Sequence, residues 1–127
     1  EYARNNPRVR LVENFGHQGH LSMMEHSVAM LGNSSSGIIE AASFKLPVVN
    51  IGTRQDGRVR GKNVIDVGYA VAEIQAGIEK AVSKTFCSTL QDLVNLYGEG
   101  KAGERIVEVL AKVNLKKLLV KRFCDLG

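Results

Sequence analysis

Residues 32–40 have the residue types and spacing of a phosphate-binding turn. They read Gly-Asn-Ser-Ser-Ser-Gly-Ile-Ile-Glu and follow an apolar run at residues 27–31. Glycine and small hydroxyl residues between a strand and a helix let backbone N–H groups point at an anion, and the helix dipole adds about half a positive charge there. The same pattern also suits a serine-capped helix that binds no ligand. The candidate phosphate ligands are Ser34, Ser35, Ser36 and Gly37.

A carboxylate stands just after this turn. Glu40 is predicted one turn inside the helix that begins there, where the helix dipole favours a negative charge. Its two oxygens are also suited to accept hydrogen bonds from two sugar hydroxyls, and the local sequence leaves both roles open. A phosphate site followed by an acceptor for sugar hydroxyls indicates a nucleotide as the ligand.

A cationic loop follows, and its Arg54 stands fourteen residues after Glu40. Residues 52–62 contain four cations and three glycines, and Arg54 is the first of the cations. This composition is typical of a solvated surface loop, but it also suits an anion clamp on a mobile lid with glycine hinges. We favour the clamp and expect Arg54 to contact the same anion as the turn that contains Ser34, Ser35 and Ser36, called the serine turn below.

Other chemistry is not supported by the sequence. His17 and His20 are three residues apart, but no cysteine or carboxylate lies at a supporting spacing, so we expect no metal site. Cys87 and Cys124 are too few and too far apart for a disulfide framework. No serine–histidine–acid arrangement or paired carboxylates can be argued. We therefore assign no catalytic residue and no cofactor.

The elements that must position these residues alternate between strands and helices. We predict strands at residues 8–14, 27–31, 47–51 and 63–67, and helices at residues 19–27, 38–44, 71–84 and 104–113. Such alternation predicts an α/β fold: a Rossmann-like, three-layer parallel sheet with helices on both faces. Because ligands bind at the carboxyl ends of parallel strands, residues 33–36 and 52–54 should face one crevice.

Charge and composition narrow the function classes. The net charge is +4 over 127 residues, and residues 115–127 carry four cations against one carboxylate, which is most of that excess. A nucleic-acid-binding domain would carry its positive charge on the folded body, so we expect no nucleic-acid partner. No apolar run is long enough to span a membrane, and the polar start and scarce cysteines favour a cytoplasmic protein. Residues 114–127 form a basic amphipathic tail, suited to packing on the domain, to self-association or to a membrane surface.

Taken together, four stretches resemble the hydrolysing UDP-N-acetylglucosamine 2-epimerases of bacterial sialic-acid and capsule pathways. The stretches are residues 6–9 (Asn-Pro-Arg-Val), 13–16 (Glu-Asn-Phe-Gly), 32–41 and 47–58. The resemblance covers residues 1–113 and implies a partial UDP-binding, Rossmann-like domain, similar to the carboxyl-terminal half of a glycosyltransferase-B fold. By resemblance, the site residues are Ser34 and Ser35 for the diphosphate, Glu40 for the ribose, Arg54 for the nucleotide, and Asn14 and Phe15 for the uracil edge.

The resemblance also implies a reaction. In the family, UDP is eliminated across C1–C2 of the sugar and water is added, which gives N-acetylmannosamine and UDP. The family's acid–base carboxylates and a histidine precede the region that this chain resembles, so we expect binding of UDP or a UDP-sugar without turnover. The alternative is a non-catalytic, homo-oligomeric interaction module derived from an epimerase gene fragment. In either case we expect a homodimer, because a half-fold without its partner domain leaves an apolar face uncovered.

Overall fold

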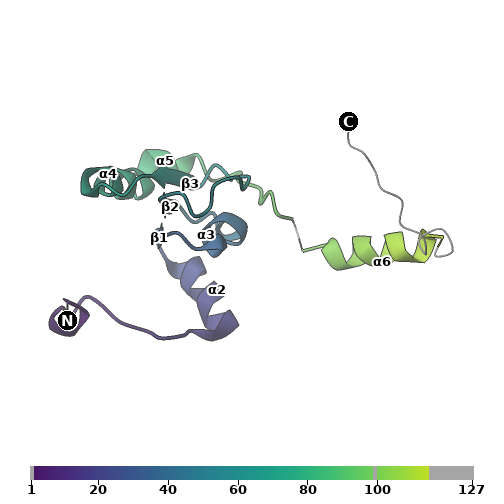
Figure 1. Ribbon diagram of the computed structural model, residues 1–127, viewed down its shortest axis with the longest axis horizontal. Helices are drawn as coiled ribbons and strands as arrows, with labels where there is room; N and C mark the ends of the chain where they lie inside the picture. Colours follow the sequence, from purple (N-terminus) through teal and green to yellow (C-terminus); the bar gives the residue numbers. More distant parts are fainter. Residues whose placement is uncertain (1, 99, 115–127) are drawn as a thin grey trace. The chain divides into compact units, whose positions relative to one another are not determined.

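The computed structural model describes residues 2–98 and 100–114 and divides the chain into two units, residues 1–97 and 98–127. The first unit contains a three-stranded parallel sheet in the order β1-β2-β3 (Figure 1). Its strands are β1 (Met30–Gly32), β2 (Val48–Ile51) and β3 (Val64–Val67). Its helices are α1 (Tyr2–Asn5), α2 (Gly16–His26), α3 (Ser35–Ile39), the 3₁₀ helix η1 (Ala41–Phe44), α4 (Val71–Ala81) and α5 (Lys84–Ser88).

Helices cover both faces of this sheet, which confirms the predicted three-layer α/β fold. On one face, Val48 packs with Met24 of α2 and Ala41 of η1. On the other face, Val49 packs with Ala81 of α4 and Ile65 of β3. Because successive strand residues point to opposite faces, these adjacent valines supply one core residue to each layer. Figure 1 shows α4 and α5 on one side of the strands, and α2 and α3 on the other.

The predicted strand at residues 8–14 is wrong. These residues follow a turn in which the Val9 amide donates to the Asn6 carbonyl (3.0 Å), and they then run without regular structure to α2. Leu11 is 88% exposed. An alternating apolar pattern becomes a strand only where a neighbouring strand accepts its backbone hydrogen bonds, and residues 8–14 pair with no strand among the described residues.

Three predicted helices have different bounds in the structure. α2 begins at Gly16 instead of residue 19, and the Asn14 side chain accepts from the Gly16 amide (2.7 Å) at this start. The helix predicted at 38–44 is two short segments, α3 and η1, and it starts earlier because Ser34 caps α3. The helix predicted at 71–84 ends at Ala81, and Ser83 then caps the separate α5 by accepting from the Phe86 amide (3.2 Å).

The second unit contains α6 (Ala102–Lys112), close to the predicted helix at 104–113. Four of its apolar side chains are between 58% and 66% exposed: Ile106, Val107, Val109 and Leu110. No helix among the described residues is both long and apolar enough to cross a lipid bilayer. The tail from 115 onwards lies outside the described residues, so its expected roles and the expected homodimer stay predictions.

Gly77 tests the packing of α4 on the sheet. A Cβ at Gly77 would lie 2.9 Å from Cγ1 of Val67 and 3.0 Å from Cγ1 of Val49, which is too close for stiff β-branched side chains to accommodate. We expect Gly77→Ala to lower the free energy of unfolding by about 1–2 kcal/mol, since overpacking outweighs the gain in helix propensity.

The measurement is urea unfolding followed by circular dichroism. The control is Gln75→Ala on the exposed side of the same helix, which we expect to stay within about 0.5 kcal/mol of the wild type. A Gly77→Ala protein as stable as the wild type would contradict the close packing of α4.

Candidate functional site

The candidate site lies at the carboxyl ends of the three strands. The parallel register pairs Gly32 with Asn50 and Asn50 with Asp66, so the strands end at one edge of the sheet. The chain leaves each strand there for a different loop. The serine turn follows β1, the cationic loop follows β2, and Gly68 and Tyr69 follow β3.

The structure brings residues 33–36 and 52–54 together, as the topology predicts. The Asn33 carbonyl accepts one hydrogen bond from Arg54 Nη1 (2.8 Å) and a second from Gln55 Nε2 (2.8 Å). Arg54 is exposed, whereas Gln55 is only 3% exposed. The guanidinium therefore lies at the residue that precedes the serine turn.

The serine turn has the geometry of a capped helix start. Ser34 lies at the N-cap of α3 in an extended conformation, and its hydroxyl oxygen accepts from the Ser36 amide (3.3 Å). Among the described residues, the backbone N–H groups of Ser34 and Ser35 have no acceptor. Gly37 is buried, and a Cβ there would lie 2.8 Å from Val48 Cγ1, so glycine lets α3 approach β2.

The sequence predicted Glu40 one turn inside a helix, and this prediction is wrong. It stands between α3 and η1, where it is the C-cap of one and the N-cap of the other. Its carboxylate Oε2 lies 3.6 Å from His20 Nε2 of α2, and the two side chains are 39% and 38% exposed. Glu40 is therefore not placed to be stabilised by the helix dipole at the start of α3. The neighbour that the structure gives its carboxylate is His20.

Asn14 and Phe15 lie at the start of α2. Asn14 uses its side-chain oxygen to hold the Gly16 amide, and Phe15 is the N-cap residue with 45% of its surface exposed. The structure links α2 to the serine side of the site through His20 and Glu40. The proposed contact of Asn14 and Phe15 with uracil stays a prediction.

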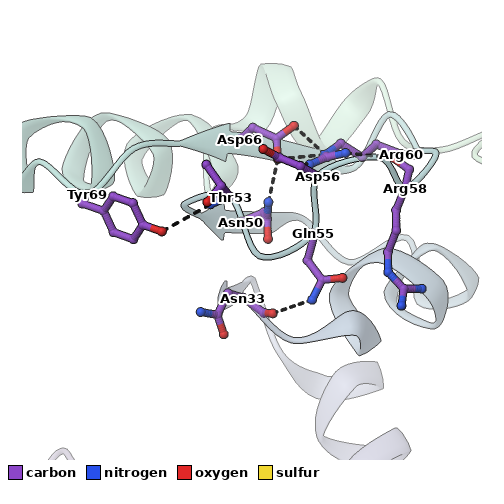
Figure 2. A network of polar contacts seen from close by, with 9 residues as sticks. All are labelled: Asn33, Asn50, Thr53, Gln55, Asp56, Arg58, Arg60, Asp66 and Tyr69. Atoms are coloured by element: carbon purple, nitrogen blue, oxygen red, sulfur yellow. Dashed lines mark hydrogen bonds and ion pairs between the residues drawn. The ribbon is translucent and has the colours of Figure 1, made fainter.

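Tyr69 closes one side of the cationic loop. Gly52 has a φ of 73°, which favours glycine, and the tip of the Tyr69 side chain lies where a Cβ at this position would project. The Tyr69 hydroxyl accepts weakly from the Thr53 amide (3.4 Å) (Figure 2). A cleft of about 500 Å³ lies beside this contact, between the ends of β2 and β3.

An ion-pair network fixes the far end of the same loop. Arg60 Nε lies 2.8 Å from an Asp66 carboxylate oxygen, and Arg60 Nη2 lies 3.2 Å from Asp56. Asn50, which is 1% exposed, donates to the same Asp66 carboxylate (2.7 Å) and so connects the network to the centre of the sheet. Figure 2 shows the Arg60 side chain directed toward the two aspartates, and the Arg58 side chain directed away from them.

Three residues of this site were not predicted from the sequence. Gln55, Tyr69 and His20 each contact a candidate residue or its loop through a long-range interaction. The sequence did contain one indication for Gln55, because this residue follows Arg54 directly in a loop that was expected to meet the serine turn. Tyr69 and His20 had none, since each depends on how two elements pack.

Comparison with known proteins identifies the family. The model of the UDP-N-acetylglucosamine 2-epimerase family matches residues 1–111, which include all the candidate site residues. The chain belongs to this family. The match agrees with the resemblance seen in the serine turn and in the cationic loop.

Members of the epimerase family with assigned names are similar over most of this chain. The hydrolysing UDP-N,N′-diacetylbacillosamine 2-epimerase of Legionella pneumophila is 40% identical, over 91% of this chain and 30% of its own length. The hydrolysing GDP/UDP-N,N′-diacetylbacillosamine 2-epimerase of Campylobacter jejuni is 42% identical, over 97% and 32%. The UDP-N-acetylglucosamine 2-epimerase of Neisseria meningitidis is 34% identical, over 84% and 28%. The chain thus spans about a third of the length of these epimerase relatives.

Arg60 and Arg58 offer a matched test of the ion-pair network. We expect Arg60→Ala to increase amide hydrogen exchange across residues 53–60, because it removes the contacts to Asp56, Asp66 and the Arg58 carbonyl. Hydrogen exchange measured by mass spectrometry tests this.

Arg58→Ala is the control, since it removes the same charge from the same loop but its guanidinium has no partner among the described residues. Equal loss of protection in both variants would show that the network does not order the loop.

Proposed function

We propose that this chain carries the UDP-binding part of a UDP-sugar 2-epimerase site. The single observation that carries this proposal is the contact of Arg54 with the Asn33 carbonyl. It holds a cation from the β2 loop beside the start of α3, where the Ser34 and Ser35 amides lack an acceptor among the described residues. A diphosphate is the ligand that both groups suit, because it accepts hydrogen bonds from amides and pairs with a guanidinium.

The position of Glu40 supports a nucleoside diphosphate over a free phosphate. Glu40 is the sixth residue after Ser34, which is roughly 9 Å along a helical path. The Glu40 carboxylate is 39% exposed, so it is open to two ribose hydroxyls. His20 Nε2 lies 3.6 Å from one of its two oxygens. Family membership supports the same assignment, and the names of the relatives add UDP-sugars as the substrate class.

The proposed role is that of the leaving-group half of the active site. Amides and a cation placed at the diphosphate stabilise the charge that develops on UDP as the bond to C1 breaks. Binding UDP equally well before and during the reaction gives affinity without rate, and removal of the C2 proton needs a positioned base. We assign no such base in this chain and propose that it binds UDP without turning over a sugar nucleotide by itself.

Arg54 and Arg58 provide a paired test of binding. We expect the wild-type chain to bind UDP weakly and Arg54→Ala to bind it at least about tenfold more weakly, because a charge-assisted hydrogen bond contributes roughly 1.5–3 kcal/mol. Isothermal titration with UDP measures this effect. Uridine, titrated in parallel, should show no difference between the two proteins because it lacks the diphosphate.

Arg58→Ala controls for the general field of the loop and should stay within about twofold of the wild type, since surface charges contribute little individually. Undetectable binding of millimolar UDP by the wild type would overturn the proposed function. If both substitutions weakened UDP binding equally, this would contradict a specific role of Arg54.

Turnover is tested separately. We expect the purified 127-residue chain, incubated with UDP-N-acetylglucosamine, to release no N-acetylmannosamine above a buffer blank. Chromatography of the sugar and of UDP measures the products, and a full-length member of the family serves as the positive control. Release of N-acetylmannosamine would contradict the proposal that proton transfer at C2 is not provided by this chain.

A further inference from the structure

The Asn33 carbonyl accepts from one exposed side chain and one buried side chain. Arg54 Nη1 and Gln55 Nε2 both lie 2.8 Å from this oxygen, and a carbonyl oxygen has two lone pairs, so both bonds coexist. Arg54 is exposed and has room to turn, whereas Gln55 is only 3% exposed. The same backbone group thus has one exposed donor and one buried donor.

This double pairing bears on how Arg54 reaches a ligand. If Arg54 were the only donor, turning its guanidinium to an anion would leave the Asn33 carbonyl without a partner and would lower the affinity by the cost of that lost bond. With Gln55 in place, the carbonyl stays paired when Arg54 leaves. We propose that Gln55 is a positioning residue that keeps the Asn33 carbonyl paired and so frees Arg54 to bind the diphosphate. This inference rests on the proposed function.

The orientation of the Gln55 amide supports this role. Its Nε2 points at Asn33, and its Oε1 is buried without a hydrogen-bond partner among the described residues (Figure 2). The opposite orientation would place two carbonyl oxygens against each other, so the Asn33 carbonyl itself selects the observed one. Burying the Gln55 Oε1 without a partner costs free energy, and the hydrogen bond from Nε2 to the Asn33 carbonyl offsets part of this cost.

The loop around Gln55 is held by contacts that do not involve Arg54. The Thr53 amide donates to the Tyr69 hydroxyl (3.4 Å), and the Asp56 carboxylate pairs with Arg60 (3.2 Å). These contacts lie on either side of Arg54 and Gln55 in the chain. Movement of the guanidinium alone therefore leaves the backbone of the loop, and with it the Gln55 side chain, in place.

The main test is a double-mutant cycle with Gln55→Met, which keeps the length of the side chain but removes the donor. We expect Gln55→Met to weaken UDP binding about tenfold in the wild-type background and to have no further effect in Arg54→Ala. Uridine affinity should not change. A merely structural role would instead weaken UDP and uridine alike and would persist in Arg54→Ala. Gln75→Met, exposed on α4, is the matched control and should bind UDP as the wild type does.

The four proteins of the cycle (the wild type, Gln55→Met, Arg54→Ala and the double variant) also allow a measurement that does not need UDP. Because either donor keeps the Asn33 carbonyl paired, the loss in melting temperature of the double variant should exceed the sum of the two single losses. Additive losses would overturn the proposed shared carbonyl. If the wild type bound no UDP, the proposed function would fail, and the melting temperatures would still decide whether the two donors substitute for each other.

A measurement on the unmodified chain covers the case in which Gln55→Met does not fold. The Gln55 side-chain amide protons, observed by NMR, should exchange slowly with solvent both without UDP and at saturating UDP. Rapid exchange in either state would overturn the proposal, since the amide would then not stay on the Asn33 carbonyl.

Discussion

The parallel pairing of β1 with β2, and of β2 with β3, is the constraint on which the rest of this structure depends. Because the three strands run in one direction and in register, their carboxyl ends release three loops at one edge of the sheet. The serine turn, the Arg54 loop and Tyr69 come from distant parts of the chain, yet each needs only a few residues to reach this edge. Val48 and Val49 hold that arrangement by packing against helices on opposite faces.

Polar side chains then determine the form of the loops. Asn50 is buried in the middle strand and holds Asp66, which in turn holds Arg60 and the end of the cationic loop. Gln55 performs a similar task at the start of that loop, where it donates to the Asn33 carbonyl. Such buried bonds stabilise a unique geometry because leaving a buried polar group unpaired costs more than a single hydrogen bond contributes. The site is thus ordered by side chains that need not touch a ligand.

The arrangement favours one kind of chemistry. Hydrogen-bond donors and a cation lie together at the start of α3, and the Glu40 carboxylate follows between α3 and η1, which supports the proposed nucleotide site. Its members come from β1, β2 and their following loops, within a chain that spans about a third of its epimerase relatives. A division between leaving-group stabilisation and proton transfer agrees with the general need for both in an elimination.

The sequence by itself determined the α/β class, three of the strands and the family, because periodicity and local motifs are properties of neighbouring residues. It also predicted that residues 33–36 and 52–54 would meet, since strand direction alone decides that. It failed at residues 8–14, where the alternating pattern is present but a partner strand is not, and at Glu40, which lies between two short helices. Only the tertiary structure could place His20 beside Glu40, Tyr69 against Gly52 and Gln55 on Asn33. The physical reason is that each contact joins elements distant in the chain, and side-chain geometry between packed elements leaves no periodic trace in the sequence.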